Sequence, residues 1–143
     1  MTRPVKRWAC TMRDEGRAVV DASLVIDFVL GTEGAASIGE RIEGIELWAP
    51  AHFDAEVLSA FGRMERAGAL SAAEADLRLR AALAVPLRRE LLADLALGAW
   101  ARRAALRLAD ALYVELASRL GAPLLTTDAR LARAVPIAEV LPA

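Results

Sequence analysis

The chain has 143 residues, of which 56% are hydrophobic, and its formal net charge is −1 at pH 7. This length is most simply one domain, and the longest apolar runs fall far short of the roughly 18 residues that span a bilayer. The near-neutral charge provides no global electrostatic footprint of a nucleic-acid-binding protein. The single cysteine, Cys10, excludes an internal disulfide framework and favours a reducing cytoplasm.

Residues 1–16 are basic but lack the apolar stretch of a secretory signal. We therefore predict a mobile N-terminal extension over 1–16. The rest of the chain contains no repeat, low-complexity tract or Pro/Gly-rich linker. A single domain is expected over 17–143.

Short apolar runs alternate with stretches of helical period, which is typical of alternating strands and helices. "AVVD" predicts a strand and "SLVIDFVLG" a helix, with Ser23 as its N-cap and Gly31 at its end. A helix around "AASIGERIEG" and a strand at "ELWAP" follow. Apolar residues at helical spacing then predict a helix over His52–Ala67.

The second half continues the alternation. "SAAEADLRLRAALA" predicts a helix that opens with the capping-box pair Ser71 and Glu74. Next come a weak strand in "VPLRREL", helices near Leu91–Ala105 and Leu108–Leu120, a clear strand in "APLLTTD", a short helix "ARLARA" and a terminal "AEVL". This order predicts an α/β protein whose parallel sheet carries helices on both faces. In such sheets the functional crevice lies outside the carboxyl ends of the strands.

Several chemistries are excluded by the residue inventory. One His52 and one Cys10 cannot build a Cys/His zinc site or a Cys–His nucleophilic pair of ordinary spacing. The only lysine is Lys6, so no phosphate-binding G-x-x-x-x-G-K-[ST] loop exists. His52 is more simply a partly buried residue at a helix start. Carboxylate chemistry remains.

Four acids stand at positions suited to a common site. Asp21 and Asp128 end two strands, so both project into one crevice if the strands are neighbours. Asp110 opens its helix, and Glu56 lies near the start of another, beside the apolar stripe. Each acid alone is also explained by helix capping or by an ion pair with arginine.

Together the four acids favour a metal site. Like charges that converge on one cleft repel each other unless cations offset them. Hard oxygen ligands select Mg²⁺ or Mn²⁺. Such a cation polarises a phosphoryl oxygen and activates a bound water, which makes a phosphodiester the natural substrate.

The segments that contain these acids resemble a known family. "VVDASLVIDF", "APAHFDAEVLSAFGRMERAGAL" and "RLADALYVELASRLGAPLLTTDARLARA" look like the successive motifs of PIN-domain proteins, and especially of VapC-type ribonuclease toxins of type II toxin–antitoxin modules. The resemblance covers about Ala18 to Pro142 in order and spacing. It implies a PIN-like three-layer α/β/α fold with a central parallel sheet.

The resemblance also implies function. It matches the family's four acids to Asp21, Glu56, Asp110 and Asp128, and its hydroxyl position to Thr126. These acids are then the catalytic and metal-binding residues, with Asp21 and Asp110 as direct Mg²⁺ ligands, while Thr126 supports the site rather than acts on the substrate. The implied activity is a Mg²⁺- or Mn²⁺-dependent endoribonuclease that hydrolyses RNA with metal-activated water and is held in check by a cognate antitoxin. A cytoplasmic homodimer without membrane association is expected.

Other residues have open or structural interpretations. Trp48, Trp100 and Tyr113 are expected in the core rather than stacked on RNA bases. Arg102 and Arg103 could clamp phosphate or lie on a solvated face.

Three further acids, Asp27, Asp54 and Asp94, lie off the strand-end pattern and are taken as surface or packing-edge charges.

Two alternative functions are kept. A catalytically silent binding module of the same fold is disfavoured by the four intact acids. A nuclease directed at DNA is excluded by no residue.

Overall fold

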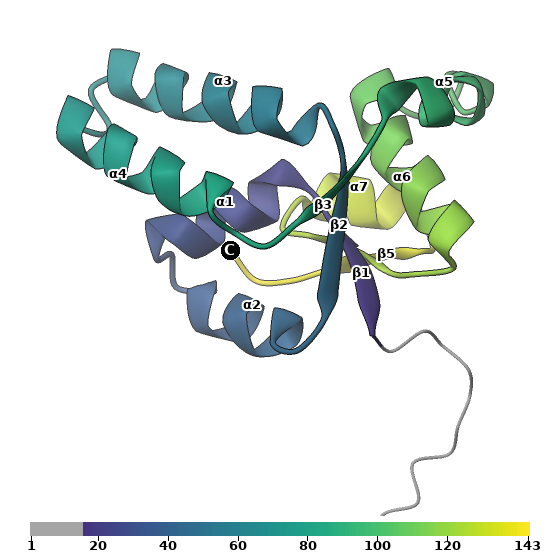
Figure 1. The fold of residues 1–143 in the computed structure, drawn as a ribbon, viewed down its shortest axis with the longest axis horizontal. Helices are drawn as coiled ribbons and strands as arrows, with labels where there is room; N and C mark the ends of the chain where they lie inside the picture. The colour runs from purple at the N-terminus through teal and green to yellow at the C-terminus, as the bar shows by residue number, and fades with distance from the viewer. Residues whose placement is uncertain (1–15) are drawn as a thin grey trace, which may run out of the picture.

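Five parallel strands form one sheet in the order β3-β2-β1-β4-β5 (Figure 1). The structure is a computed structural model and describes residues 16–143. The strands are β1 Arg17–Val20, β2 Glu46–Pro50, β3 Arg88–Glu90, β4 Leu124–Thr126 and β5 Ala138–Val140. Apart from Gly16, the extension expected over 1–16 lies outside the described residues, and so does Cys10.

Helices cover both faces of the sheet and give the expected three layers (Figure 1). One face carries α1 Ala22–Leu30, α2 Ala35–Ile42, α3 Phe53–Arg66 and α4 Ala72–Leu83; the other carries α5 Leu92–Ala101, α6 Leu108–Leu120 and α7 Ala129–Ala134. This division follows from right-handed crossovers, because the chain moves from β1 towards β3 in its first half and back past β1 to β5 in its second. The predicted fold class is confirmed.

The strand order reverses at β1, and this reversal determines where a site can form. Val19 of β1 pairs with Trp48 of β2 on one side and with Leu124 of β4 on the other. The chain leaves β1 towards one layer of helices and β4 towards the other. A crevice therefore opens beyond the carboxyl ends of these two strands.

The helix boundaries agree with most expectations. Gly31 ends α1 in the left-handed conformation at φ 69°, and Ser71 and Glu74 form the predicted capping box of α4. The expected N-cap Ser23 is wrong: Asp21 caps α1, and its side chain accepts from the Leu24 N–H. Both residue types can cap a helix, and the end of β1 at Val20 selects the earlier one.

The central strands are buried on both faces. Ala18, Val19 and Val20 of β1 are fully inaccessible to solvent, which explains a continuous apolar run instead of an alternating one. Helix α5 is different, because it packs mainly on α6 at the edge of the molecule. It ends at Ala101, earlier than the expected Ala105.

The three aromatic residues that were expected in the core differ in solvent exposure. Tyr113 is buried as predicted, and Trp48 is half-buried with its indole N–H donating to Glu46. The prediction for Trp100 is wrong, because this side chain is 54% exposed. It lies on α5, whose inward positions are taken by Leu95 and Ala99. None of the helices in the described range is both long enough and apolar enough to cross a membrane.

Candidate active site

Asp21 is the buried centre of the site. It follows β1 directly, and only 6% of its surface is exposed. Its Oδ1 accepts from the Ser23 hydroxyl at 2.8 Å and from the Leu24 N–H at 3.0 Å, and its Oδ2 accepts from the Thr126 hydroxyl at 2.6 Å. A carboxylate offers about four acceptor positions. Oδ2 therefore keeps capacity for one further ligand.

Burial dominates the protonation of Asp21. It raises the pKa of this carboxyl to about 6, and the nearby Glu56 adds to the rise. The three donated hydrogen bonds, from Thr126, Leu24 and Ser23, oppose the shift without cancelling it. The protein therefore does not fully compensate a negative charge on Asp21.

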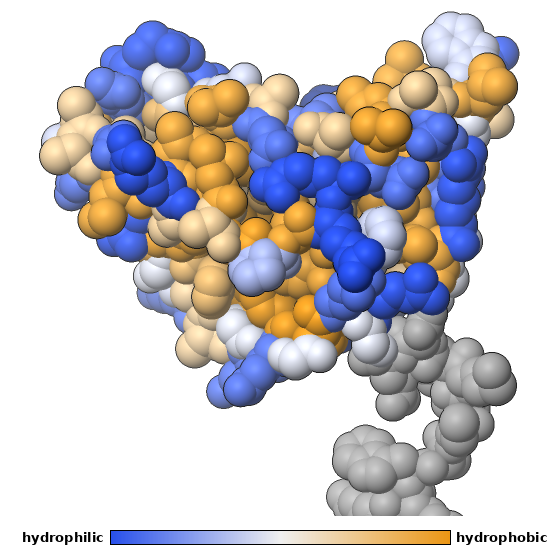
Figure 2. Space-filling view, viewed as in Figure 1, coloured by the Kyte–Doolittle hydropathy of each residue, from blue (hydrophilic) through white to orange (hydrophobic). Residues whose placement is uncertain are grey.

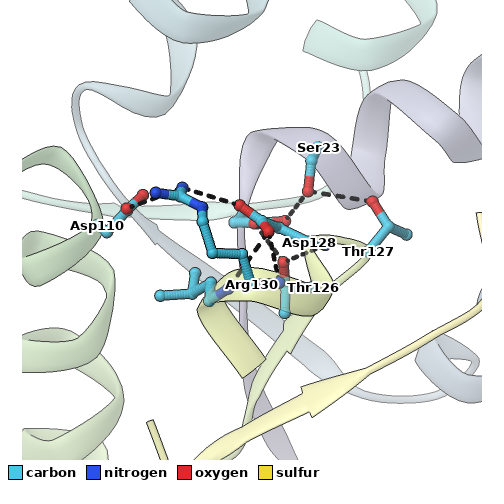
Figure 3. Close-up of polar contacts among 8 residues, drawn as sticks. Ser23, Asp110, Thr126, Thr127, Asp128 and Arg130 are labelled. Carbon is cyan, nitrogen blue, oxygen red and sulfur yellow. Dashed lines mark hydrogen bonds and ion pairs between the residues drawn. The ribbon is translucent and has the colours of Figure 1, made fainter. Parts of the chain in front are cut away.

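The segment after β4 holds the second part of the site (Figure 3). Thr126 is fully buried, and its hydroxyl both donates to Asp21 and accepts from the Asp128 N–H at 2.9 Å. Asp128 caps α7, with Oδ1 accepting from the backbone N–H groups of Arg130 and Leu131. Thr126 therefore connects two of the predicted acids through one hydroxyl.

A second hydroxyl ties the same segment to α1. The Thr127 Oγ1 donates to Asp27 at 2.6 Å and lies 3.1 Å from the Ser23 hydroxyl (Figure 3). The expected edge position of Asp27 agrees with its half-buried state. Its carboxylate supports the loop between β4 and α7.

Arg130 lies between Asp110 and Asp128 (Figure 3). Its Nη2 is 3.5 Å from Asp110 Oδ2 and 3.2 Å from Asp128 Oδ2. Asp110 comes from the first turn of α6, so the guanidinium joins α6 to α7. One cation is shared by two carboxylates.

The two acids respond differently to this arrangement. Burial raises the pKa of Asp110, and Asp128 and Glu56 raise it further against the opposing effect of Arg130. Burial also acts on Asp128, but hydrogen bonds from the Arg130 side chain and from two backbone N–H groups lower its pKa overall. Asp110 is therefore the acid whose negative charge the protein compensates less.

Glu56 approaches from α3, on the opposite layer of helices. Its Oε1 lies 2.8 Å from His52 Nε2 yet is buried without a hydrogen-bond partner among the described residues. His52 Nε2 instead bonds the Ala109 carbonyl at 3.1 Å. The Tyr113 hydroxyl is buried beside Glu56, and burial raises its pKa, as do Glu56 and Asp21.

The donor set suits a hard cation in a hydrated state. Within residues 16–143, no three His, Cys, Asp or Glu side chains are grouped closely enough to hold a metal ion by themselves. Mg²⁺, however, usually keeps several waters and takes only one or two carboxylates. The open position on Asp21 Oδ2 and the unpartnered Glu56 Oε1 are oxygen donors of the required kind.

The structure thus brings the predicted acids to one crevice by two routes. Asp21 and Asp128 follow neighbouring strands, as expected, and are linked through Thr126. Glu56 and Asp110 reach the crevice from helices on opposite faces of the sheet. Electrostatic interactions connect Glu56 with both Asp21 and Asp110.

Two contributors were not anticipated from the sequence. Arg130 is one of 17 arginines, and no local pattern distinguishes it. His52 was expected only as a partly buried residue at a helix start, which is where it lies. The open interpretation of Arg102 is resolved as structural, because its guanidinium pairs with Glu115 at 3.0 Å.

The crevice adjoins a cavity of about 480 Å³ between α1 and α3. Its lining includes Ser23, His52 and Glu56 from the site together with small residues such as Ala55 and Ala60. In the space-filling view, the outline of the molecule dips between the α3–α4 pair and the α5–α6 pair (Figure 2). Of the four acids, Glu56 lines this cavity.

Comparison with known proteins agrees with this arrangement. The PIN domain family matches residues 18–135. Ribonuclease VapC3 of Mycobacterium tuberculosis is 52% identical over 126 residues, which cover 87% of this chain and 92% of that protein. Ribonuclease VapC12 of the same organism is 36% identical over 115 residues, covering 80% and 89%.

A solved structure supports the fold independently. The crystal structure of PAE2754 from Pyrobaculum aerophilum superposes with a TM-score of 0.64 at 19% sequence identity, over 95% of this chain and 91% of that one. At this identity the likeness concerns the fold alone. The family match and the similarity across nearly full lengths establish that the chain belongs to the PIN-domain family and, within it, to the ribonucleases of the VapC type.

Proposed function

We propose that this protein, over residues 17–143, is a Mg²⁺- or Mn²⁺-dependent endoribonuclease that acts as the toxin of a type II toxin–antitoxin module. The observation that supports it best is the placement of four acids beyond β1 and β4, with Asp21 buried and its charge incompletely compensated. Such a site has a deficit of positive charge that a divalent cation corrects.

The proposed roles follow from the contacts. Asp21 and Asp110 hold the cation, and Glu56 and Asp128 complete the site directly or through water. The cation supplies Lewis acidity towards a phosphoryl oxygen and lowers the pKa of the attacking water. Thr126 fixes the orientation of Asp21 by its 2.6 Å hydrogen bond and leaves one acceptor position of Oδ2 for the ligand.

Cleavage of RNA by purified protein tests this proposal. Wild type should cut total RNA with Mg²⁺ or Mn²⁺ and not with EDTA. Asp21→Asn and Asp110→Asn should each lose on the order of 10³-fold in rate, since several kcal/mol of transition-state stabilisation depend on the cation. Asp76→Asn is the matched control, because Asp76 is an exposed acid on α4 paired with Arg80.

The outcomes separate the alternatives. Undiminished cleavage in EDTA, or by both site variants, contradicts the metal-site assignment. Cleavage of single-stranded DNA in preference to RNA of the same sequence identifies a DNA-directed nuclease. Absence of any cleavage by folded wild type identifies a catalytically silent binding module.

The toxin role concerns the cell. Induced expression of the protein in the cytoplasm should arrest the growth of the cells, and co-expression of the cognate antitoxin should relieve the arrest. We place an apolar segment of the antitoxin in the cavity between α1 and α3, which adjoins Glu56 and is lined partly by small side chains. If Ser59→Arg, on the rim of that cavity, leaves antitoxin binding unchanged, the placement is wrong.

A homodimer is also part of the proposal. Apolar side chains gather over α5 (Figure 2), where Leu97 is 84% exposed and Leu91 66% exposed. Apolar patches of this kind often mark interfaces between proteins. Light scattering should give a dimer mass for wild type and a monomer mass for Leu97→Glu; a wild-type monomer contradicts the expectation.

A further inference from the structure

We propose that His52 is a positioning residue of the active site, whose imidazole joins the start of α3 to the start of α6 and so sets Glu56 relative to Asp110. This inference rests on the proposed function, since it concerns the geometry of the same acids. Its physical basis is a ring that is largely buried, with 14% of its side chain exposed.

The protonated nitrogen of the ring follows from the neighbouring atoms. His52 Nε2 lies 3.1 Å from the Ala109 carbonyl and 2.8 Å from Glu56 Oε1. Both oxygens can only accept from it, so Nε2 carries the hydrogen. The single N–H of Nε2 points towards one acceptor, and the geometry is that of a hydrogen bond to the Ala109 carbonyl. Glu56 Oε1 therefore accepts no hydrogen bond from the ring.

This hydrogen bond reaches the residue directly before Asp110. His52 is the N-cap position of α3, and Ala109 lies in the first turn of α6. The bond therefore spans 57 positions of sequence and joins helices on opposite faces of the sheet. Its two ends lie next to the carboxylates that these helices contribute.

Packing holds the ring in this orientation. The imidazole and the Tyr113 ring have centroids 4.8 Å apart at an interplanar angle of 52°. His52 Nδ1 is buried and has no hydrogen-bond partner in the described part of the chain. The ring is thus fixed by Nε2 and by its contact with Tyr113. Glu56 Oε1 lies beside the ring, 2.8 Å from Nε2, and accepts no hydrogen bond among the described residues.

Two substitutions separate the hydrogen bond from the packing. His52→Phe keeps an aromatic ring against Tyr113 but removes the donor, whereas His52→Gln restores an N–H donor at a similar reach. Groups that orient metal ligands typically contribute 10- to 100-fold to metal affinity or activity. Asp76→Asn is the control, because Asp76 is an exposed acid on α4 that pairs with Arg80.

The measurements are Mn²⁺ affinity by titration calorimetry, kcat and KM for RNA, and the melting temperature in EDTA. We expect His52→Phe to weaken Mn²⁺ binding and to lower kcat about 10-fold with KM little changed. His52→Gln should recover most of both, and Asp76→Asn should resemble wild type. Wild-type Mn²⁺ affinity in His52→Phe, or no recovery in His52→Gln at equal melting temperature, overturns the proposal.

A further readout depends on neither metal nor RNA. His52 is the only histidine in the chain, so its ring nitrogens are assigned without ambiguity in a ¹⁵N NMR spectrum of untagged protein. In EDTA at pH 8.5 the spectrum should show the Nε2–H tautomer. The Nδ1–H tautomer overturns the role of His52 even if cleavage is normal, whereas absent cleavage with the Nε2–H tautomer contradicts the proposed function alone.

Discussion

Two carboxylates of α6, Asp110 and Glu115, lie in different environments on the same helix, and we propose a catalytic role for Asp110 only. Glu115 lies 3.0 Å from Arg102 and 2.8 Å from Arg119, so two guanidinium groups surround it. Asp110 shares the guanidinium of Arg130 with Asp128, at the longer distance of 3.5 Å, and Arg107 adds only a weaker electrostatic effect.

The pKa shifts of the two acids have opposite signs. Burial raises the pKa of Asp110, and its acidic neighbours Asp128 and Glu56 add to the rise. Burial acts on Glu115 as well, but the hydrogen bonds from Arg119 and Arg102 outweigh it and lower the pKa. The protein thus completes the environment of Glu115 and leaves that of Asp110 short of positive charge. In the function proposed above, a divalent cation would supply the positive charge that the environment of Asp110 lacks.

The packing around Glu115 shows the same contrast. Gly98 of α5 has no side chain at the point where a Cβ would collide with the Glu115 carboxylate. The close approach of α5 and α6 therefore depends on this glycine and on the clamp formed by Arg102, Glu115 and Arg119. Glu56, in contrast, lines the cavity between α1 and α3.

Asp21→Asn should show the largest stability effect, and it should be stabilising. The raised pKa of about 6, against 3.8 for the unfolded chain, means that the folded state binds the proton more tightly. In EDTA the free energy of unfolding of wild type should therefore fall as pH rises from 4 through 6, by about 3 kcal/mol in total. Asp21→Asn should lose this fall and exceed wild type in stability at pH 8.

Urea unfolding at a series of pH values measures this effect. The neutral amide avoids the cost of a buried charge and can keep the hydrogen bonds to Ser23 and Leu24. A variant that is less stable than wild type at pH 8, with the same pH dependence, would show that Asp21 is a structural acid like Glu115.

Glu115→Gln should act in the opposite direction. Removing the charge between Arg102 and Arg119 should lower the free energy of unfolding at pH 7 by about 1.5–3 kcal/mol, the range for hydrogen bonds to charged groups. Because the pKa of Glu115 is lowered, the loss should shrink as pH falls below the ordinary glutamate range. Thermal unfolding at pH 7 and pH 3.5 measures it, and RNA cleavage at 25 °C should stay unchanged. A 10-fold loss of cleavage would remove the distinction between the two acids.

The two acids at strand ends could be predicted because their sequence signals are local. "AVVD" and "APLLTTD" end in acids after short apolar runs, and β1 and β4 do place Asp21 and Asp128 at neighbouring strand ends. The N-cap was misassigned to Ser23 because Asp21 and Ser23 are both capping residues. The end of strand β1 selects Asp21 as the cap. A sequence pattern places the end of a strand only to within a few residues, so it does not distinguish the two.

The contacts between distant segments could not be predicted. Nothing near Arg130 shows that its guanidinium reaches Asp110, because that contact depends on how α6 and α7 pack. The same holds for His52, whose partner Ala109 lies 57 positions away. Trp100 was expected in the core since large aromatics usually are buried, but α5 packs through Leu95 and Ala99 and turns Trp100 outward.

Arg130→Gln should produce the smallest effect and bears most directly on the contrast between the two acids. If Arg130 provides the positive charge that Asp110 and Asp128 share, it must oppose the entry of a divalent cation by repulsion. The side chain is 52% exposed, so solvent screens the interaction, and the gain in Mn²⁺ affinity without RNA should be about two- to fivefold. Titration calorimetry at low ionic strength measures it.

Arg133→Gln controls for net charge, since Arg133 is exposed and lies in the last turn of the same helix. The gain in Arg130→Gln should diminish with added salt, because screening weakens repulsion in both proteins. An equal gain in Arg133→Gln would assign the effect to overall charge. Weaker Mn²⁺ binding in Arg130→Gln would show that Arg130 holds Asp110 and Asp128 in position for the cation, in the way that Arg102 and Arg119 hold Glu115 for the fold.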